Sequence, residues 1–248
     1  MCKIFILFLF FFLGVFSSSY SADYKKGLAA ARSGDFATAL KEWQPLAEQG
    51  NANAQYSLGM MHDRGDGVLQ DGVAAEKWYR LAAKQGLVHA QYNLAWMYHR
   101  GNGVDQDYKE AIKWYRSAAI QGYSMARCNL GLMYVNGTGV LKDYEEGIKW
   151  LRYAAEQGNI IAQSNLGLIY YQGENIIEDK FIAHIWLNIA ISLGSKLAKE
   201  NKDKLMKNMS DLQIEKAKDL TRQYFYRLNI FSGSNFSLIT VYSSQSFP

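Results

Sequence analysis

The most regular feature of the chain is a pattern of apolar and small residues that repeats every 36 positions. From Ala54 to His62, apolar residues return at spacings of four, seven and eight, the pattern of one face of an amphipathic helix. A second helical pattern runs from about Val73 to Gln85 and stops at Gly86, a residue suited to the left-handed end of a helix. We call a set of residues that lie one period apart a column, and at seven positions of the period the same residue returns every 36 residues. Three of these columns are Leu58, Leu94, Leu130 and Leu166; Trp78, Trp114, Trp150 and Trp186; and Gly50, Gly86, Gly122, Gly158 and Gly194. Chance does not align so many columns, so the pattern predicts repeated pairs of helices.

Each pair is predicted to be a hairpin whose apolar side is buried only by the next hairpin. The second helix is expected to turn Ala75, Trp78 and Ala82 inward, with the tryptophan filling the larger gap. An aspartate stands at the N-cap position of this helix, and Asp107 and Asp143 are each followed three residues later by glutamate, as in a capping box. Hairpins stacked in this way predict an all-α fold, an α-solenoid of antiparallel helix hairpins.

Several motifs inside the period carry a family resemblance. The run Ala-Gln-Tyr-Asn-Leu-Ala at 90–95, the Gly-x-Gly-Val loop, Trp114-Tyr115 and Gly122 resemble the Sel1-like repeat (SLR) family, a branch of the tetratricopeptide-like superfamily. The resemblance covers residues 51–194 as four repeats. It implies a right-handed solenoid and a concave groove, lined by the first helix of each repeat, in which a protein or peptide binds.

The N-terminus has the composition of a secretory signal peptide. One lysine precedes the apolar run from Ile4 to Phe16, and serines follow it. The run is shorter than the roughly 20 residues that span a bilayer, so we expect residues 1–21 to be removed after Ser21, with no stable membrane span in the mature chain. An uncleaved leader that acts as an anchor is the alternative.

The segments on either side of the four repeats are less regular. Residues 22–50 are expected to form a degenerate first hairpin with a tight turn at Ser33-Gly34. Residues 195–227 are lysine-rich, and Ser210 and Gln213 form a capping box there, so this segment is predicted to be a pair of capping helices. Residues 228–248, which follow these helices, contain no charged side chain and are expected to form a flexible tail. Within this tail, residues 236–242 are apolar enough to dock in a groove.

Composition and charge narrow the range of functions. A formal charge of +4 over 248 residues is too dilute for a nucleic-acid footprint, and Cys2 and Cys128 cannot form a disulfide framework. The four histidines are not at metal-ligand spacing, and the Gly-x-Gly loops lack the rest of a nucleotide motif, so no metal or cofactor is predicted. Basic columns on the second helices, which include Arg80 and Arg152, are interpreted as a solvated outer face, with contact to an anionic surface as the alternative.

The candidate binding residues come from comparing the four repeats with one another. Columns that stay constant serve stacking, whereas columns that vary on the opposite face of the first helix are free to serve a partner. The resemblance places the peptide groove on the same helix face. The predicted partner-binding groove consists of Tyr56, Met60, His89, Tyr92, Trp96, His99, Cys128 and Leu132. The alternative for any one of them is that its side chain fills a gap between neighbouring helices.

These observations predict a non-catalytic scaffold that binds a protein or peptide and contains no catalytic residues. We expect it to be a monomer that is periplasmic or secreted. The alternative function is a cell-wall or β-lactam hydrolase or binding protein of the cysteine-rich repeat type. The chain lacks the repeated cysteine pairs of those proteins, which disfavours this alternative.

Overall fold

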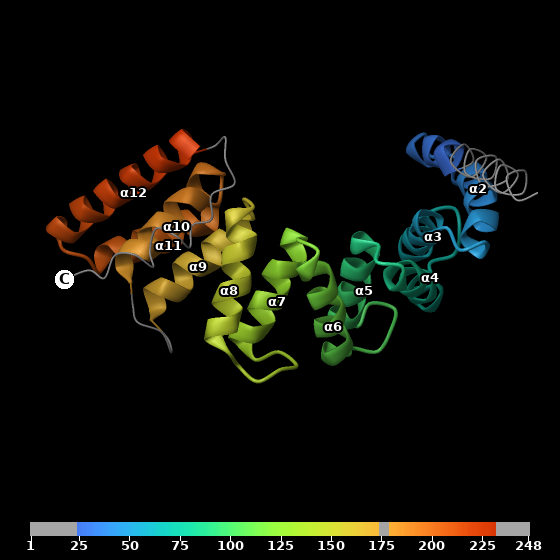
Figure 1. Ribbon diagram of the computed structural model, residues 1–248, viewed down its shortest axis with the longest axis horizontal. Helices are drawn as coiled ribbons and strands as arrows, with labels where there is room; N and C mark the ends of the chain where they lie inside the picture. Colours follow the sequence, from blue (N-terminus) through green and yellow to red (C-terminus); the bar gives the residue numbers. More distant parts are fainter. Residues whose placement is uncertain (1–23, 174–178, 232–248) are drawn as a thin grey trace, which may run out of the picture. The chain divides into compact units, whose positions relative to one another are not determined.

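The computed structural model describes residues 24–173 and 179–231, and these residues contain helices and turns with no strand (Figure 1). Residues 24–32 form a first short helix. It is followed by α2 Phe36–Glu48, α3 Ala52–Arg64, α4 Gly72–Lys84, α5 Val88–Arg100, α6 Tyr108–Ile120, α7 Ser124–Asn136, α8 Tyr144–Glu156, α9 Ile160–Gln172, α10 Lys180–Ser192, α11 Lys196–Lys207 and α12 Asp211–Phe231. The all-α hairpin fold predicted from the period is confirmed. The chain divides into two compact units, unit 1 up to Ala118 and unit 2 from Ala119.

Consecutive helices pack against each other within each unit, so each hairpin shares its core with the next. The position after the repeated tryptophan is the most deeply buried position of the second helix, and it holds Tyr79, Tyr115, Leu151 and Leu187, each at most 1% exposed. Trp114 is also buried, but Trp78 is only partly so. The prediction that the tryptophan fills the larger gap therefore holds in part, because its neighbour fills the deepest one.

Glycine in the first helix makes room for this deep side chain. A Cβ atom on Gly59 would lie 2.5 Å from the Tyr79 ring, and one on Gly167 would lie 2.6 Å from Leu187 Cγ. The loop glycines serve a second close approach, since a Cβ on Gly103 would lie 2.5 Å from the Cα of Gly72 at the start of α4. Two backbones can meet there only because neither residue has a side chain.

The predicted N-caps are confirmed, but the predicted capping boxes are only half formed. Asp143 Oδ1 accepts a hydrogen bond from the Glu146 amide at 3.0 Å. The glutamate does not return the bond, because Glu146 Oε1 instead accepts from Trp150 Nε1 at 2.7 Å. Glu110 accepts from Trp114 Nε1 at 3.0 Å in the same way. The glutamate thus fixes the tryptophan four residues later and gives its indole N–H a partner.

Glutamine side chains join each hairpin to the one before it. Gln55 Nε2 donates to the carbonyl of Ala47 at 3.0 Å, and Gln163 Nε2 donates to the carbonyl of Ala155 at 3.0 Å. Each of these carbonyl groups also accepts a backbone N–H, from Gly50 and Gly158 respectively, so the glutamine adds a second hydrogen bond at the C-terminal end of the preceding helix. Gln85 adds a second link in unit 1, because its Nε2 donates to the Gly50 carbonyl at 2.9 Å and to Gln55 Oε1 at 2.8 Å. We call these contacts the glutamine joints.

The last glutamine joint is incomplete. Gln163 is 2% exposed, and its Oε1 has no hydrogen-bond partner. Gln85, Gln121 and Gln157 are each one period apart, but the next position of this column holds Leu193. The donor that Gln85 supplies to Gln55 in unit 1 is therefore missing at the end of the repeats.

The arginine columns of the second helices lie closer to the protein than predicted. Arg80 Nε pairs with Glu76 Oε1 at 2.6 Å, and its guanidinium lies over the ring of Tyr98 and donates to the hydroxyl. Arg152 lies over Tyr170 in the equivalent way. The interpretation as a solvated face is wrong for Arg80 and Arg152, because each one ties a second helix to the next first helix, whereas Arg116 in the same column is exposed. The neighbouring Lys113 and Lys149 do lie exposed.

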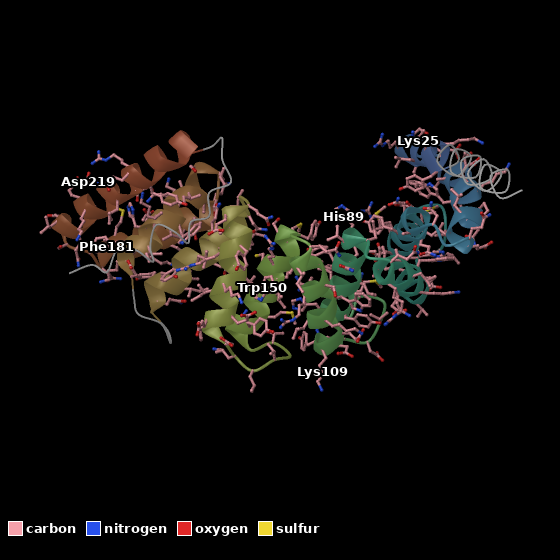
Figure 2. The ribbon with its side chains drawn as sticks, viewed as in Figure 1. Lys25, His89, Lys109, Trp150, Phe181 and Asp219 are labelled. Atoms are coloured by element: carbon pink, nitrogen blue, oxygen red, sulfur yellow. The ribbon has the colours of Figure 1, made fainter. Side chains whose placement is uncertain are left out.

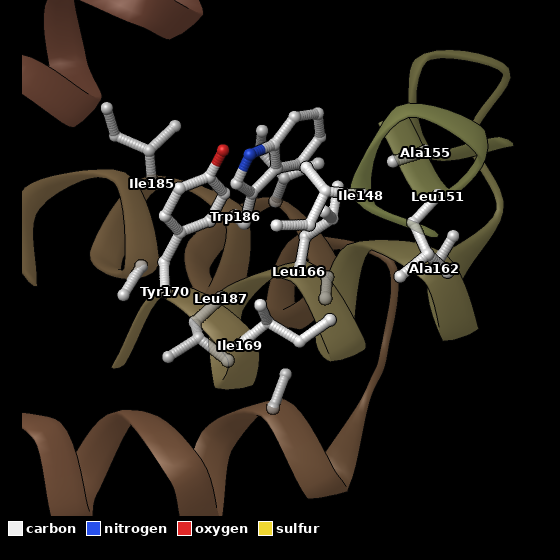
Figure 3. Close-up of a cluster of buried hydrophobic side chains, with 14 of the residues drawn as sticks. Ile148, Leu151, Ala155, Ala162, Leu166, Ile169, Tyr170, Ile185, Trp186 and Leu187 are labelled. Atoms are coloured by element: carbon white, nitrogen blue, oxygen red, sulfur yellow. The ribbon is translucent and has the colours of Figure 1, made fainter. Parts of the chain in front are cut away.

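Unit 2 contains the largest apolar cluster, in which Leu166, Ile169 and Leu187 meet between α8, α9 and α10 (Figure 3). α11 and α12 extend this cluster through residues such as Ala198 and Ala217. The capping box before α12 is confirmed in both directions by the bonds between Ser210 and Gln213. α12 continues to Phe231, beyond the predicted boundary at 227, whereas the predicted leader 1–21 and the segment 236–242 lie outside the described residues.

A buried polar group lies where α10, α11 and α12 meet. His184 is 2% exposed, and its Nδ1 lies 2.9 Å from the hydroxyl of Thr221 on α12. Lys202 Nζ on α11 donates to Asn188 Oδ1 at 2.7 Å, one helical turn from the histidine. Burial, and then the charges of Lys202 and Lys218, lower the pKa of His184 to about 4. The ring is therefore neutral near pH 7.

A search of the described helices for a stretch long and apolar enough to cross a membrane found none.

Candidate functional site

Five of the predicted groove residues form one surface of unit 1. Tyr56 and Met60 lie on α3, and His89, Tyr92 and Trp96 lie on α5; we call this surface the α3–α5 face. His89 and Trp96 are exposed, Trp96 by 37%, while the other three are half-buried (Figure 2, where His89 is labelled). The rings of Tyr56 and His89 have centroids 6.2 Å apart, so the two helices contribute to one continuous aromatic surface.

The deep tyrosines of the second helices support this face from below. The Tyr56 ring packs on Tyr79 with centroids 5.7 Å apart, and the Tyr92 ring packs on Tyr115 with centroids 5.8 Å apart. Tilted ring pairs at this separation are favourable and hold both partners in fixed orientations. The aromatic side chains of the face are therefore positioned before any partner arrives.

The hydroxyl groups of the deep tyrosines are bound by the first helix. Tyr79 donates to Asp63 Oδ2 at 3.3 Å, and the Tyr115 hydroxyl lies 3.4 Å from His99 Nδ1. Burial, and then the charge of Asp63, raises the pKa of Tyr79 above its ordinary value. Asp63 also accepts from Asn102 Nδ2 at 3.2 Å.

His99, a predicted groove residue, is half-buried between aromatic rings. It meets Tyr108 and Tyr115 edge-on, with centroids 5.8 and 5.9 Å away. Burial lowers its pKa, and the charge of Arg100 lowers it further. Its observed contacts are those of a side chain that joins α5 to α6.

The two predicted residues on α7 belong to unit 2. Cys128 is 2% exposed, and burial raises the pKa of its thiol to about 12. A thiol with so high a pKa carries almost no thiolate near pH 7, so Cys128 does not fit the role of a nucleophile. It lies beneath the surface and does not line it. Leu132 is half-buried and packs on the apolar cluster of unit 2.

The variable residues of the first helix change together with the most deeply buried residue of the second helix, the position of Tyr79, Tyr115 and Leu151. Where that position is Tyr79 or Tyr115, the first helix supplies a tyrosine to pack on the ring and a polar residue to bind the hydroxyl. Where it is Leu151, the equivalent residues are Cys128 and Val135, both buried. Much of the variation that suggested a partner site is therefore internal matching between two helices.

Sequence reasoning did not single out Tyr79 and Tyr115, the residues that support the face. Their column changes from tyrosine to leucine along the chain, so a search for identical residues passes over it. Its constant property is size, and comparing side-chain volume through the repeats would have revealed it. Within the described residues, no group of three or more His, Cys, Asp or Glu side chains is placed to hold a metal ion.

Comparison with known proteins gives a consistent result. The model of the Sel1 repeat matches residues 52–87, 88–123, 124–159 and 160–195. A search of curated proteins found no match. Among solved structures, the chain is similar to a protective antigen present in uropathogenic Escherichia coli strains that displays an SLR fold, with 32% identity and a TM-score of 0.74 over 88% of this chain. It spans about half of that protein, 49%.

A second similar structure is a Sel1 repeat protein from Oxalobacter formigenes, with 33% identity and a TM-score of 0.64. The match covers 69% of this chain and 68% of that one. The four matched repeats, each a pair of helices in the structure, take up more than half of the residues. The chain therefore belongs to the Sel1 repeat family.

Proposed function

We propose that the protein is a non-catalytic scaffold that binds a protein or peptide through the α3–α5 face. The observation that carries the proposal is the exposed, preorganised aromatic surface formed by Tyr56, His89, Tyr92 and Trp96. Tryptophan and tyrosine are the residues most often found at binding hot spots, because a large ring buries much area with few rotamers to fix. Met60 beside them adds an adaptable apolar contact.

The state of the titratable groups near this face supports binding over catalysis. Asp63 and His99 are engaged with the buried tyrosine hydroxyls, and Cys128 is a buried thiol with a raised pKa. Because Asp63 and His99 already bind these hydroxyls and Cys128 is buried, none of the three is presented to a substrate as a general acid, base or nucleophile.

Export to the periplasm or the exterior is part of the same proposal. It is supported by the apolar N-terminal segment followed by serines, and by the similar E. coli protein, which is a protective antigen. Expression of the full chain and sequencing of its N-terminus tests this part. A new N-terminus at or next to Ala22 in an exported fraction supports export, whereas an intact Met1 in the cytoplasm contradicts it.

Affinity capture followed by quantitative binding tests the scaffold. The full chain captures candidates, and the affinity of each purified candidate is then measured for the wild type, for Trp96→Ala and for the matched control Val73→Ala, whose side chain is exposed elsewhere in unit 1. We expect Trp96→Ala to weaken binding about 30-fold, equivalent to about 2 kcal/mol, with no change in the melting curve. Equal affinities for all three forms would contradict the assignment of this face.

A further inference from the structure

Unit 2 exposes a row of apolar side chains at the beginnings of its first helices. Met125, Ile161 and Leu197 are the second residues of α7, α9 and α11, one period apart. They are 44%, 58% and 58% exposed. Ile160 and Leu193 are exposed beside them, and we call these five residues the apolar ridge.

The repeat itself does not require this ridge. The equivalent positions in unit 1 hold Asn53 and His89, both polar and exposed. Exposed apolar side chains that recur at one position of neighbouring repeats, and that stacking does not demand, suggest a binding surface. The ridge therefore needs an occupant.

Two of the three helices that carry the ridge, α7 and α9, are almost without charge, whereas α11 is rich in charge and has Lys196 directly beside Leu197. α9 has no charged residue along its whole length, and the one charged residue of α7 is Arg127. Arg127 is already engaged, since its Nε donates to the Ala119 carbonyl at 2.9 Å and its guanidinium lies over the Tyr153 ring. Over α7 and α9 a charged occupant would lose hydration without gaining an ion pair, so this part of the ridge favours an uncharged apolar occupant.

The chain carries a segment of this chemistry. Residues 232–248 contain no charged side chain, and Phe236, Leu238, Ile239, Val241 and Tyr242 lie within a stretch of seven. Fully extended, residues 232–248 reach about 55 Å. Crossing three neighbouring helices takes about 30 Å at the usual spacing between helix axes, so the segment is long enough to follow the ridge.

α12 delivers this segment to the correct end of unit 2. Lys216 lies over the ring of Phe181, and Thr221 bonds His184, so α12 runs in the same direction as α10. From Thr221, α12 continues for about 15 Å to Phe231, and from His184, α10 continues for about 12 Å to its own end. The two helices therefore end at the same level.

The end of α10 lies beside the ridge. Leu193 follows α10 directly, and the turn continues through Ser195 into α11, which carries Leu197 at its start. The Ser195 hydroxyl lies 3.0 Å from the Ser164 hydroxyl on α9, so the turn also contacts the helix that carries Ile161. The described end of α12 is thus level with Leu193, at one end of the ridge.

We propose that residues 236–242 bind along the apolar ridge of their own chain and cover it. Residues 236–242 and the α9 part of the ridge carry no charge, so their association buries apolar area without stranding an ion. The proposal concerns a different surface from the α3–α5 face and stands apart from the proposed function.

Photo-crosslinking in the full chain tests this contact. Phe236 is replaced by the photoreactive p-benzoylphenylalanine, the protein is irradiated at about 1 μM, and the linked peptides are mapped by mass spectrometry. We expect the main products to join residue 236 to α9 or α11 within one chain. Ile161→Asp should reduce this product at least about fivefold, and the matched control Leu69→Asp, at a site that is 91% exposed in unit 1, should leave it unchanged.

Three results would overturn the proposal. Products between two chains would show that a second copy occupies the ridge, and products that map outside the ridge would show that the segment binds elsewhere. A yield unaffected by Ile161→Asp would show that the ridge does not hold the segment. Circular dichroism of each variant confirms folding, which is expected to be unchanged because Ile161 and Leu69 are exposed.

Discussion

The first two repeats and the last two build the same hairpin with different chemistry. In unit 1, Tyr79 and Tyr115 fill the deepest position, and their rings and hydroxyls are matched by Tyr56, Tyr92 and polar partners. In unit 2, leucines fill that position, and Cys128 and Val135 replace the tyrosine and the polar partner beside Leu151. The difference shows that each repeat needs a large side chain at the deep position of its second helix. The residue at that position and the first-helix residues that contact it change together.

This difference also determines what each surface offers. A tyrosine below requires an aromatic side chain above it, and unit 1 therefore presents rings to solvent on the α3–α5 face. Unit 2 keeps Cys128 and Ser164 below the surface and exposes aliphatic side chains on the apolar ridge. Core chemistry and surface chemistry thus change together along the chain.

The largest expected effect comes from truncating the apolar form of the deep position. Leu151→Ala removes a fully buried side chain from unit 2 and leaves a cavity, so we expect it to lower the free energy of unfolding by about 2–5 kcal/mol. Urea denaturation followed by circular dichroism measures the loss. The control Leu69→Ala, at a fully solvated loop position, should change stability by less than about 0.5 kcal/mol. Similar curves for the two variants would contradict the assigned core.

Acid is expected to distinguish unit 2 from unit 1 through His184. The unfolded chain protonates this histidine near its ordinary pKa of 6.5, whereas the folded chain does so only near about 4. Stability is therefore full above pH 6.5 and is lost as the pH falls toward 4, by about 3 kcal/mol. Hydrogen exchange of α10 and α12 measures the loss across this range. His184→Gln, which does not titrate, should flatten the dependence; parallel pH profiles for variant and wild type would contradict the prediction.

A smaller loss of stability is expected from removing the hydroxyl of a tyrosine at the deep position. Tyr79→Phe keeps the ring but removes the hydroxyl that donates to Asp63, so stability should fall by about 1–2 kcal/mol. Thermal melting measures the change, with Tyr144→Phe, in which the lost hydroxyl accepts a bond from Lys142 at the surface, as control. A double-mutant cycle with Asp63→Ala should return a coupling of similar size. Additive effects would show that the hydroxyl and the carboxylate do not interact.

The smallest expected effect is a gain in stability. Leu193→Gln supplies the donor that the last glutamine joint lacks, opposite the unpartnered Gln163 Oε1, and should raise stability by about 1 kcal/mol. Leu193→Ala, which removes the leucine without adding a donor, controls for the loss of an exposed apolar side chain. If both variants melt alike, the unpartnered oxygen costs the fold nothing.

Sequence reasoning predicted the helices, their boundaries to within a few residues and the position of the N-caps, because these depend on local spacing and local hydrogen bonds. It could not predict where Glu146 would direct its carboxylate, since the alternatives of its own backbone and Trp150 are both within one turn. Nor could it predict that Cys128 is buried while Tyr92, in the same column, is half-buried, because one column was treated as one environment. Those outcomes depend on the residue opposite, in another helix.

The glutamine joints have a consequence for how such a chain changes length. One joint links residues eight positions apart, as from Gln55 to Ala47, and the other links residues 35 apart, as from Gln85 to Gly50. A duplication or deletion of one whole period inside the array preserves both offsets, so a boundary between repeats that carry both glutamines keeps its joint. A gene encoding this protein can therefore gain or lose a repeat by unequal recombination without any compensating substitution at the boundary.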